Sequence, residues 1–179
     1  DRRNRALLLV ERWARRHDRP LQISYTLPVE PAGLEADGLA VLRDAVRVGT
    51  RVAVVNIMTF DYYDGVTTDM GAAAISAARG LHRQLHELYP HRSSRRLWAM
   101  VGVTILPGID DYPRKTEVTY LRDAARLRRF AERVGIGTLS MWAIERDNGA
   151  CPGRIDSNTC SGIAQAPWAM ALSRYRWAG

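Results

Sequence analysis

The chain has 179 residues, 46% of them hydrophobic, which suits one folded domain with its own core and excludes a disordered segment. A formal net charge of +7 raises the question of nucleic-acid binding, but the arginines are dispersed along the chain and Lys115 is the only lysine. No stretch approaches the ~20 apolar residues of a membrane span, and the first residues do not resemble a signal peptide. The composition therefore predicts a soluble domain whose partners include neither nucleic acid nor membrane.

Hydrophobic periodicity predicts helices that alternate with strands along the whole chain. In chain order, the predicted elements are a helix over 4–17, a strand over 21–27, a helix over 37–48, a strand over 52–60, a helix over 70–88, a strand over 97–105, a helix over 120–134, a strand over 138–143 and a helix over 167–176. Gly49 and Pro90 end the second and third helices, and Thr119 is a candidate N-cap for the fourth. Strands separated by helices predict parallel βαβ units and hence an α/β fold.

Four strands fit two architectures. An open flavodoxin-like sheet has the right number of strands, but the chain has no glycine-rich turn of the phosphate-binding type between a strand and the next helix. The alternative is half of a (β/α)8 barrel, which on its own would leave two long apolar edge strands unpaired. The half-barrel hypothesis predicts a chain that self-associates or dissolves poorly in isolation.

Aromatic and charged residues follow two of the predicted strands at the points where they end. The second strand runs into Asp-Tyr-Tyr-Asp-Gly at 61–65, and the fourth runs into Trp142 and the charged residues 145–147. Because the carboxyl ends of parallel strands meet at one edge of a sheet, this pattern predicts one shared cleft. An indole face can stack on the apolar face of a sugar ring, so Trp142 is a candidate sugar platform, and a core position is the alternative.

The two cysteines, Cys151 and Cys160, bracket a loop rich in turn-forming residues. We expect a disulfide, and hence an oxidising compartment, with a pair of free thiols as the alternative. A zinc site is not expected, because the spacing does not match and no histidine is near in sequence. His82 and His86 are expected on an exposed helix face rather than at a metal.

Two further pairs of charged residues are of interest. Asp110 and Asp111 follow the third strand, and the sequence leaves open whether they belong to the site or to an ordinary turn. Arg146 and Asp147 are expected to form an ion pair that fixes the loop after Trp142.

Four segments carry the strongest functional signal when taken in order. They are Val-Asn-Ile-Met-Thr-Phe-Asp-Tyr at 55–62, Leu-Trp-Ala-Met-Val-Gly-Val-Thr at 97–104, Leu-Ser-Met-Trp-Ala-Ile-Glu-Arg-Asp-Asn at 139–148 and Cys-Ser-Gly-Ile-Ala-Gln-Ala-Pro-Trp-Ala-Met at 160–170. Together they resemble bacterial chitinases of glycoside hydrolase family 18, which fold as (β/α)8 barrels. The resemblance implies that the chain, residues 1–179, is a partial catalytic domain holding strands five to eight, with the first half of the barrel absent.

The resemblance also implies a chemistry. In this family the substrate's own acetamide oxygen attacks the anomeric carbon, and a glutamic acid in the motif Asp-x-x-Asp-x-Asp-x-Glu protonates the leaving oxygen, with retention of configuration. That motif does not occur in the 179 residues and is expected just upstream of Asp1. No metal or organic cofactor is implied.

Residue by residue, the resemblance assigns roles at the strand ends. Asp61 matches the aspartate that contacts the acetamide, and Phe60 stands where many members have tyrosine. Tyr62 or Tyr63 is therefore expected to supply the hydroxyl that positions the acetamide. Trp142 matches the floor beneath the sugar at the scissile bond. The remaining expected substrate contacts are Met58, Tyr63 and Tyr25, the last of which could equally fill the barrel.

The sequence thus predicts a secreted chitinase-like enzyme that acts on chitin or N-acetylglucosamine oligosaccharides. A non-catalytic chitin-binding or lectin-like barrel is the alternative, since it would keep Trp142 without hydrolysis. A third hypothesis is an α/β interaction module truncated in evolution. The reading frame upstream of Asp1 distinguishes among the three.

Overall fold

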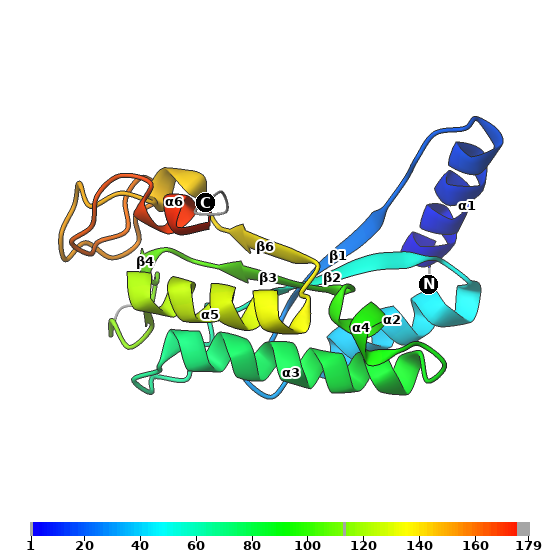
Figure 1. The fold of residues 1–179 in the computed structure, drawn as a ribbon, viewed down its shortest axis with the longest axis horizontal. Coiled ribbons are helices and arrows are strands. Elements are labelled where there is room, and N and C mark those ends of the chain that lie inside the picture. The colour runs from blue at the N-terminus through cyan, green and yellow to red at the C-terminus, as the bar shows by residue number, and fades with distance from the viewer. Residues whose placement is uncertain (1, 113, 175–179) are drawn as a thin grey trace.

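The computed structural model describes residues 2–112 and 114–174, which form a parallel four-stranded sheet with most of the helices along one side and the first and last helices near its two ends (Figure 1). In chain order the elements are α1 (Arg2–Arg16), β1 (Ile23–Pro28), α2 (Ala36–Val48), β2 (Val52–Met58), α3 (Met70–Leu88), α4 (Ser94–Trp98), β3 (Val101–Ile105), β4 (Gly108–Ile109), β5 (Val118–Thr119), α5 (Leu121–Val134), β6 (Thr138–Met141), the 3₁₀ turn η1 (Ile144–Arg146) and α6 (Ala169–Arg174). The predicted α/β fold with a parallel sheet is confirmed.

The strand order is β1-β2-β3-β6, so strands that follow one another in the chain also pair in the sheet. The register places Met58 of β2 beside Pro28 of β1 and Thr104 of β3, and Thr104 beside Ser140 of β6. The carboxyl ends of all four strands therefore lie in line at one edge. A short antiparallel pair, β4 with β5, follows β3 and was not expected from the sequence.

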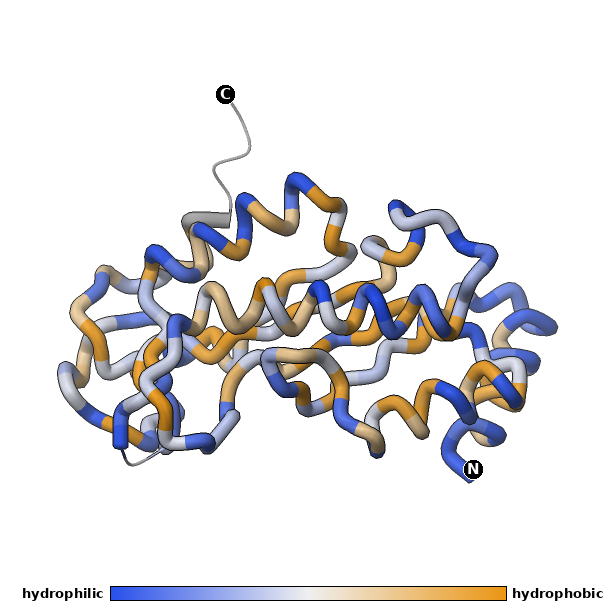
Figure 2. The backbone as a smooth tube through the Cα atoms, turned by 90° about the horizontal axis from the view of Figure 1, so that it is seen from below, coloured by the Kyte–Doolittle hydropathy of each residue, from blue (hydrophilic) through white to orange (hydrophobic). Residues whose placement is uncertain are grey.

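The core lies between the sheet and its helices. Every second strand residue points to this side, and those at 55, 57, 101 and 103 are fully buried. Helix α3 supplies small and aliphatic side chains that are also buried, namely Ala74, Ala77, Ala78, Leu81 and Leu85. Hydrophobic and hydrophilic positions alternate along the helices, as amphipathic packing requires (Figure 2). Each large aliphatic side chain buried here stabilises the fold by about 1.5–3 kcal/mol.

The helix ends have identifiable caps, one of which the sequence predicted. Gly49 ends α2 in the left-handed conformation, with φ of 85°, which glycine adopts without steric cost. Asp69 caps α3, where its side chain accepts a hydrogen bond from Ala72 N at 2.8 Å. Thr119, however, lies in β5, and the N-cap of α5 is Tyr120, so the predicted cap is wrong by one residue. The pairing of Thr119 with Gly108 holds it in the strand.

The largest error in the predicted elements falls on residues 97–100. These apolar residues read as the start of a strand, but Leu97 and Trp98 end the short helix α4, which Ser93 caps, and β3 begins at Val101. Leu97 is fully buried. The apolar run therefore indicates that these residues are buried, but it does not distinguish a helix from a strand. The last helix begins at Ala169 rather than at 167, and residues 175 and 176 of the predicted helix lie outside the described residues. None of the helices within the described ranges is both long and apolar enough to cross a membrane.

Candidate functional site

A cleft of about 640 Å³ opens at the carboxyl edge of the sheet, on the side opposite the main core. All four strands of the sheet, or the residues that directly follow them, contribute to it. The lining residues are Thr26, Asn56, Met58, Phe60, Asp61, Thr104, Ser140, Met141 and Trp142. Three of the predicted site residues, Met58, Asp61 and Trp142, thus meet in one cavity. The predicted shared cleft at the strand ends is present in the structure.

Polar side chains on neighbouring strands form a hydrogen-bonded row on the cleft floor. Asn56 Nδ2 donates to Thr104 Oγ1 at 2.7 Å and to Thr26 Oγ1 at 3.3 Å, and the Thr104 hydroxyl lies 3.1 Å from Asn56 Oδ1. The row was missed because residues 52–60 were interpreted as a strand buried on both faces. A lone asparagine within an apolar strand was the signal, since a buried amide needs partners on both of its polar atoms.

Asp61 lies in the loop just after β2, where its backbone is left-handed with φ of 57°. Burial and then the neighbouring carboxylate of Asp110 raise the pKa of its carboxyl to about 7, against a lowering by the Tyr63 phenol. Its Oδ1 atom is buried and has no hydrogen-bond partner among the described residues. The carboxyl group can therefore change its protonation state near neutral pH.

The loop after β2, residues 59–65, is held by two carboxylates on the β4–β5 hairpin. Asp110 Oδ2 accepts the amide of Asp61 at 3.0 Å, and the fully buried Glu117 accepts the amides of Tyr62 and Tyr63 at 2.9 and 2.7 Å. Three successive amides thus donate to carboxylate oxygens. Asp110 therefore belongs to the site, where it holds the β2 loop, and not to an ordinary turn. Glu117 has the same role, and the sequence analysis did not single it out.

The two tyrosines of this loop take different positions. Tyr63 is 53% exposed and lies beside Asp61, with its ring 5.7 Å from that of Tyr112. Tyr62 is only 7% exposed, does not line the cleft, and its hydroxyl has no hydrogen-bond partner among the described residues. The expected acetamide-positioning role of Tyr62 therefore needs correction, because Glu117 fixes its backbone and its ring packs into the core.

Tyr25 also lies away from the cleft. Its side chain is 5% exposed and its hydroxyl donates to Asn4 Oδ1 at 2.7 Å, towards helix α1. The adjacent Thr26 lines the cleft instead, because successive strand residues point to opposite faces. The predicted sugar contact by Tyr25 is thus contradicted by its position, which is that of a filling residue.

Trp142 follows β6 and is 62% exposed, so it presents its indole ring at the cleft rather than burying it. Its backbone amide donates to Ile105 O at 2.8 Å, which extends the β3–β6 pairing by one residue. The peptide bond between Trp142 and Ala143 is cis. Trp142 therefore stands exposed beside the polar floor of the cleft and is not a core residue.

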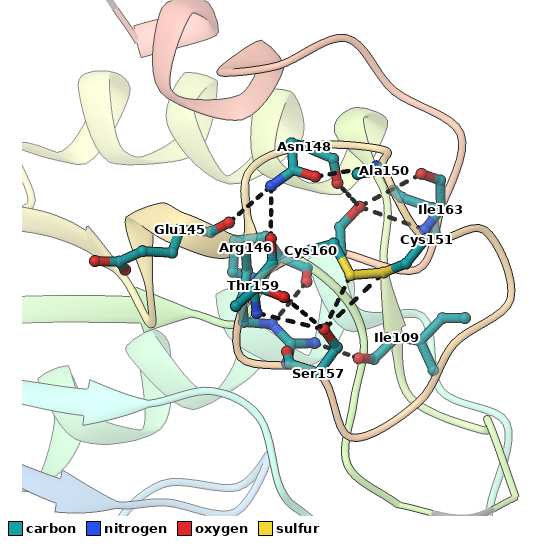
Figure 3. The surroundings of a disulfide bond; sticks show 12 residues. Ile109, Glu145, Arg146, Asn148, Ala150, Cys151, Ser157, Thr159, Cys160 and Ile163 are labelled. Carbon is teal, nitrogen blue, oxygen red and sulfur yellow. Dashed lines mark hydrogen bonds between the residues drawn. A yellow bond between two sulfur atoms is a disulfide. The ribbon is translucent and has the colours of Figure 1, made fainter.

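Arg146 organises the loop after β6, residues 142–162. Its side chain is 2% exposed, and its guanidinium donates to the carbonyl oxygens of Pro107, Ile109 and Ser157. It also lies 3.5 Å from Asp111 Oδ1. Figure 3 shows the guanidinium between Ile109 and Ser157. The buried guanidinium of Arg146 therefore links the β6 loop to residues 107–111, the segment that contains Asp110.

The expected ion pair between Arg146 and Asp147 does not form. Asp147 instead accepts hydrogen bonds from Gln165 Nε2 at 2.7 Å and from the amides of Met170 and Ala171 at 3.0 and 2.7 Å. Adjacent residues in a turn point in different directions, so each fixes a different segment. Arg146 holds the hairpin side of the loop and Asp147 holds the start of α6.

The predicted disulfide is confirmed. Cys151 and Cys160 are bonded across a separation of nine residues, with their Cα atoms 6.0 Å apart. Ser157 Oγ lies 2.9 Å from Cys160 Sγ, so the disulfide and the arginine meet at one serine (Figure 3). The disulfide thus crosslinks the same loop that the buried Arg146 side chain holds through its hydrogen bond to Ser157 O.

Taken together, the edge of a parallel α/β sheet presents an exposed indole, a carboxyl of raised pKa and a polar floor. No protein-family model matches the chain. It is 36% identical over 155 residues to a probable bifunctional chitinase/lysozyme of Escherichia coli and to endochitinase 11 of Metarhizium anisopliae. Each alignment covers 82% of the chain, but only 17% and 29% of those two proteins.

Solved structures extend the similarity to the fold. Active domain 2 of a thermostable chitinase from Pyrococcus furiosus, determined with chito-oligosaccharides, superposes with a TM-score of 0.83 at 33% identity. The catalytic domain of a hyperthermophilic chitinase from the same organism gives 0.83 at 32%. Each match covers 95% of this chain and 53% of the chitinase chain. The resemblance to chitinases is therefore confirmed in sequence and structure, and the chain spans about half of the solved catalytic domains.

Proposed function

We propose that the chain is the second half, strands five to eight, of the (β/α)8 catalytic barrel of a chitinase-like glycoside hydrolase. The parallel order β1-β2-β3-β6 is that of consecutive barrel strands, and the chain matches 53% of a solved chitinase chain. In the full-length protein the outer edges of β1 and β6 would pair with strands four and one. A closed barrel would in this way remove the two edges that the chain exposes by itself.

The observation that carries the proposed function is the meeting of Trp142 and Asp61 in one cleft. A pyranose stacked on the exposed indole would place its acetamide group near the carboxyl of Asp61. As a carboxylate, Asp61 would accept the acetamide N–H and stabilise the positive charge that develops on that group. As a neutral acid it would instead donate to the acetamide oxygen, so its pKa of about 7 sets the pH range in which it changes role.

The reaction we propose for the full-length protein is a retaining hydrolysis of β-1,4-linked N-acetylglucosamine polymers. The acetamide oxygen attacks the anomeric carbon while the bond to the leaving oxygen breaks, and a general acid gives its proton to that oxygen. Water then attacks the anomeric carbon, the bond to the acetamide oxygen breaks, and the acid's carboxylate recovers a proton from the water. The acid is expected from the family motif upstream of Asp1, and its glutamate would face Asp61 across the barrel.

We further propose that the protein is secreted. A disulfide within a loop of the site persists in an oxidising compartment, where the polymeric substrate would also be met. The proposed ligand is chitin or its oligosaccharides.

Turnover of chitotetraose tests this proposal, with the full-length protein, the 179-residue chain and the Asp61→Asn variant compared. The full-length protein should release the β-anomer first, as seen by NMR, and the 179-residue chain should show no turnover. Asp61→Asn should reduce turnover by about 100-fold or more, whereas Asp37→Asn, at an exposed position in α2, should leave it unchanged. Full-length protein that binds chitotetraose without hydrolysis would support the lectin-like alternative, and protein that neither binds nor hydrolyses it would refute both.

A further inference from the structure

A second cavity lies on the helical side of the molecule, between α3 and α5. The two helices run side by side along the sheet (Figure 1), and the cavity between them measures about 400 Å³. Its lining residues are Ala72, Ile75, Ser76 and Arg79 from α3, and Arg126, Arg129, Phe130 and Arg133 from α5. We call it the arginine pocket. It shares no residue with the cleft at the strand ends, so it is a separate surface feature.

The charge of the arginine pocket is not balanced by the residues that line it. Four guanidinium groups face one cavity, and no acidic residue lines it. Arg126 pairs with Asp69 at 3.0 Å, but both side chains are about half exposed, so the pair is well solvated. Among the described residues, Arg79, Arg129 and Arg133 have no carboxylate within ion-pair distance. The pocket therefore carries a local excess of positive charge.

Two of the arginines are held in place rather than free to move apart. The Arg79 guanidinium lies 5.3 Å from the centre of the Phe130 ring, and that of Arg133 lies 5.6 Å from the same centre. Phe130 is 3% exposed and also packs edge-on against Trp98, so its ring is fixed by the core. Cation–π contacts with one aromatic ring thus hold two arginines from different helices close together. The sequence alone, in which Arg79 and Arg133 are 54 positions apart, gives no sign of this.

We propose that the arginine pocket binds a small anion that carries two or more phosphate groups. Guanidinium groups recognise phosphate oxygens with paired hydrogen bonds, and a cluster pre-positioned by the protein loses little entropy on binding. A single inorganic phosphate would neutralise only part of the charge and fill only part of the cavity. A linear oligophosphate suits both the number of cations and the volume.

The same residues argue against a nucleic-acid strand as the ligand. Single-stranded nucleic acid binds through aromatic rings on which its bases stack, and the one ring in the pocket is buried. The flanking apolar residues are the small Ala72 and the half-buried Ile75, neither of which offers a stacking surface. The recognition chemistry available is that of anionic groups and not of bases.

Isothermal titration of the full-length protein with sodium tripolyphosphate tests this proposal, which does not rest on the proposed hydrolase activity. One molecule should bind per chain, and the double variant Arg79→Gln/Arg133→Gln should weaken binding about tenfold or more. The matched double variant Arg83→Gln/Arg122→Gln removes the same charge from exposed positions of the same two helices outside the pocket, and should change affinity less than about twofold. Both double variants change exposed residues and each removes cation–π contacts, so the two should lower the melting temperature by similar, small amounts.

Three results would overturn the proposal. The first is absence of binding. The second is an equal loss of affinity in the two double variants, which would mean that overall charge rather than the pocket attracts the anion. The third is tighter binding of a short single-stranded oligonucleotide, or of the tricarboxylate citrate, than of tripolyphosphate at equal ionic strength.

Discussion

The two loops that frame the cleft are held by opposite kinds of charge. The β2 loop is fixed by buried carboxylates, Asp110 and Glu117, that accept backbone amides. The β6 loop is fixed by a buried guanidinium, Arg146, that donates to backbone carbonyls, and by a disulfide. Burial and neighbouring carboxylates raise the pKa values of Glu117 and Asp61, whereas an arginine stays charged at any physiological pH. The β2 loop should therefore respond to pH, and the β6 loop to redox conditions.

Removing the Arg146 guanidinium should have the largest effect on the stability of the protein. Arg146→Ala leaves three carbonyl oxygens without their donor and the Asp111 carboxylate without its ion-pair partner, so we expect the free energy of unfolding to fall by about 3–5 kcal/mol. Urea denaturation of both proteins measures the difference. Arg154→Ala, at an exposed position in the same loop, should change it by less than about 0.5 kcal/mol. Equal stability of the Arg146 variant and the parent would show that the β6 loop does not depend on the guanidinium.

Removing the crosslink should have the next largest effect. Replacing both Cys151 and Cys160 by serine frees a loop closed over nine residues, and we expect a loss of about 2–3 kcal/mol in the chain-entropy model. Denaturation with and without dithiothreitol separates the crosslink from the substitutions, because the reductant should weaken the parent and leave the variant unchanged. A parent chain indifferent to the reductant, or two thiols that titrate in natively secreted protein, would contradict the prediction.

The smallest effect, and the most specific, concerns the titration of Asp61. Its pKa is raised from 3.8 to about 7 by burial and by Asp110, so folding favours its protonated form. The stability that Asp61 contributes is then fully present below pH 3.8 and is lost as pH rises from 3.8 to about 7. Relative to the parent, Asp61→Asn should gain stability across that window and level off above it, by on the order of 1 kcal/mol after solvent screening. Melting temperatures between pH 4 and pH 8 test this, with Asp37→Asn as the control, and a difference that does not vary with pH would contradict it.

Most of the fold could be predicted from periodicity, because long amphipathic helices and apolar strands leave a clear pattern. Helix α3 has the bounds that its pattern predicts, from Met70 to Leu88. The pattern fails where an apolar run is short, as at Leu97 and Trp98, since buried residues of either helix or strand look alike there. The β4–β5 pair could not be predicted either, because a strand of two residues is too short to show a periodic pattern.

The site was predictable where a strand ends in a distinctive residue, as at Asp61 and Trp142. It was not predictable where a residue acts through the backbone of another segment. Glu117 and Arg146 are far in sequence from the atoms they bind, and a charged residue in a loop is ordinarily a solvated one. Tyr25 and Tyr62 show the converse error, since an aromatic residue next to a site can equally point into the core.

The most direct test of the proposed sugar site is the effect of Trp142→Ala on chitotetraose affinity and on thermal melting in the full-length protein. Because the indole is 62% exposed, its removal should barely alter the melting temperature, while affinity should fall about tenfold or more through loss of the stacking surface. Trp168→Ala, at a residue that is 50% exposed and outside the cleft, should change neither quantity appreciably. A loss of about 3–5 kcal/mol of stability with unchanged affinity per folded molecule would make Trp142 a packing residue and contradict the sugar site.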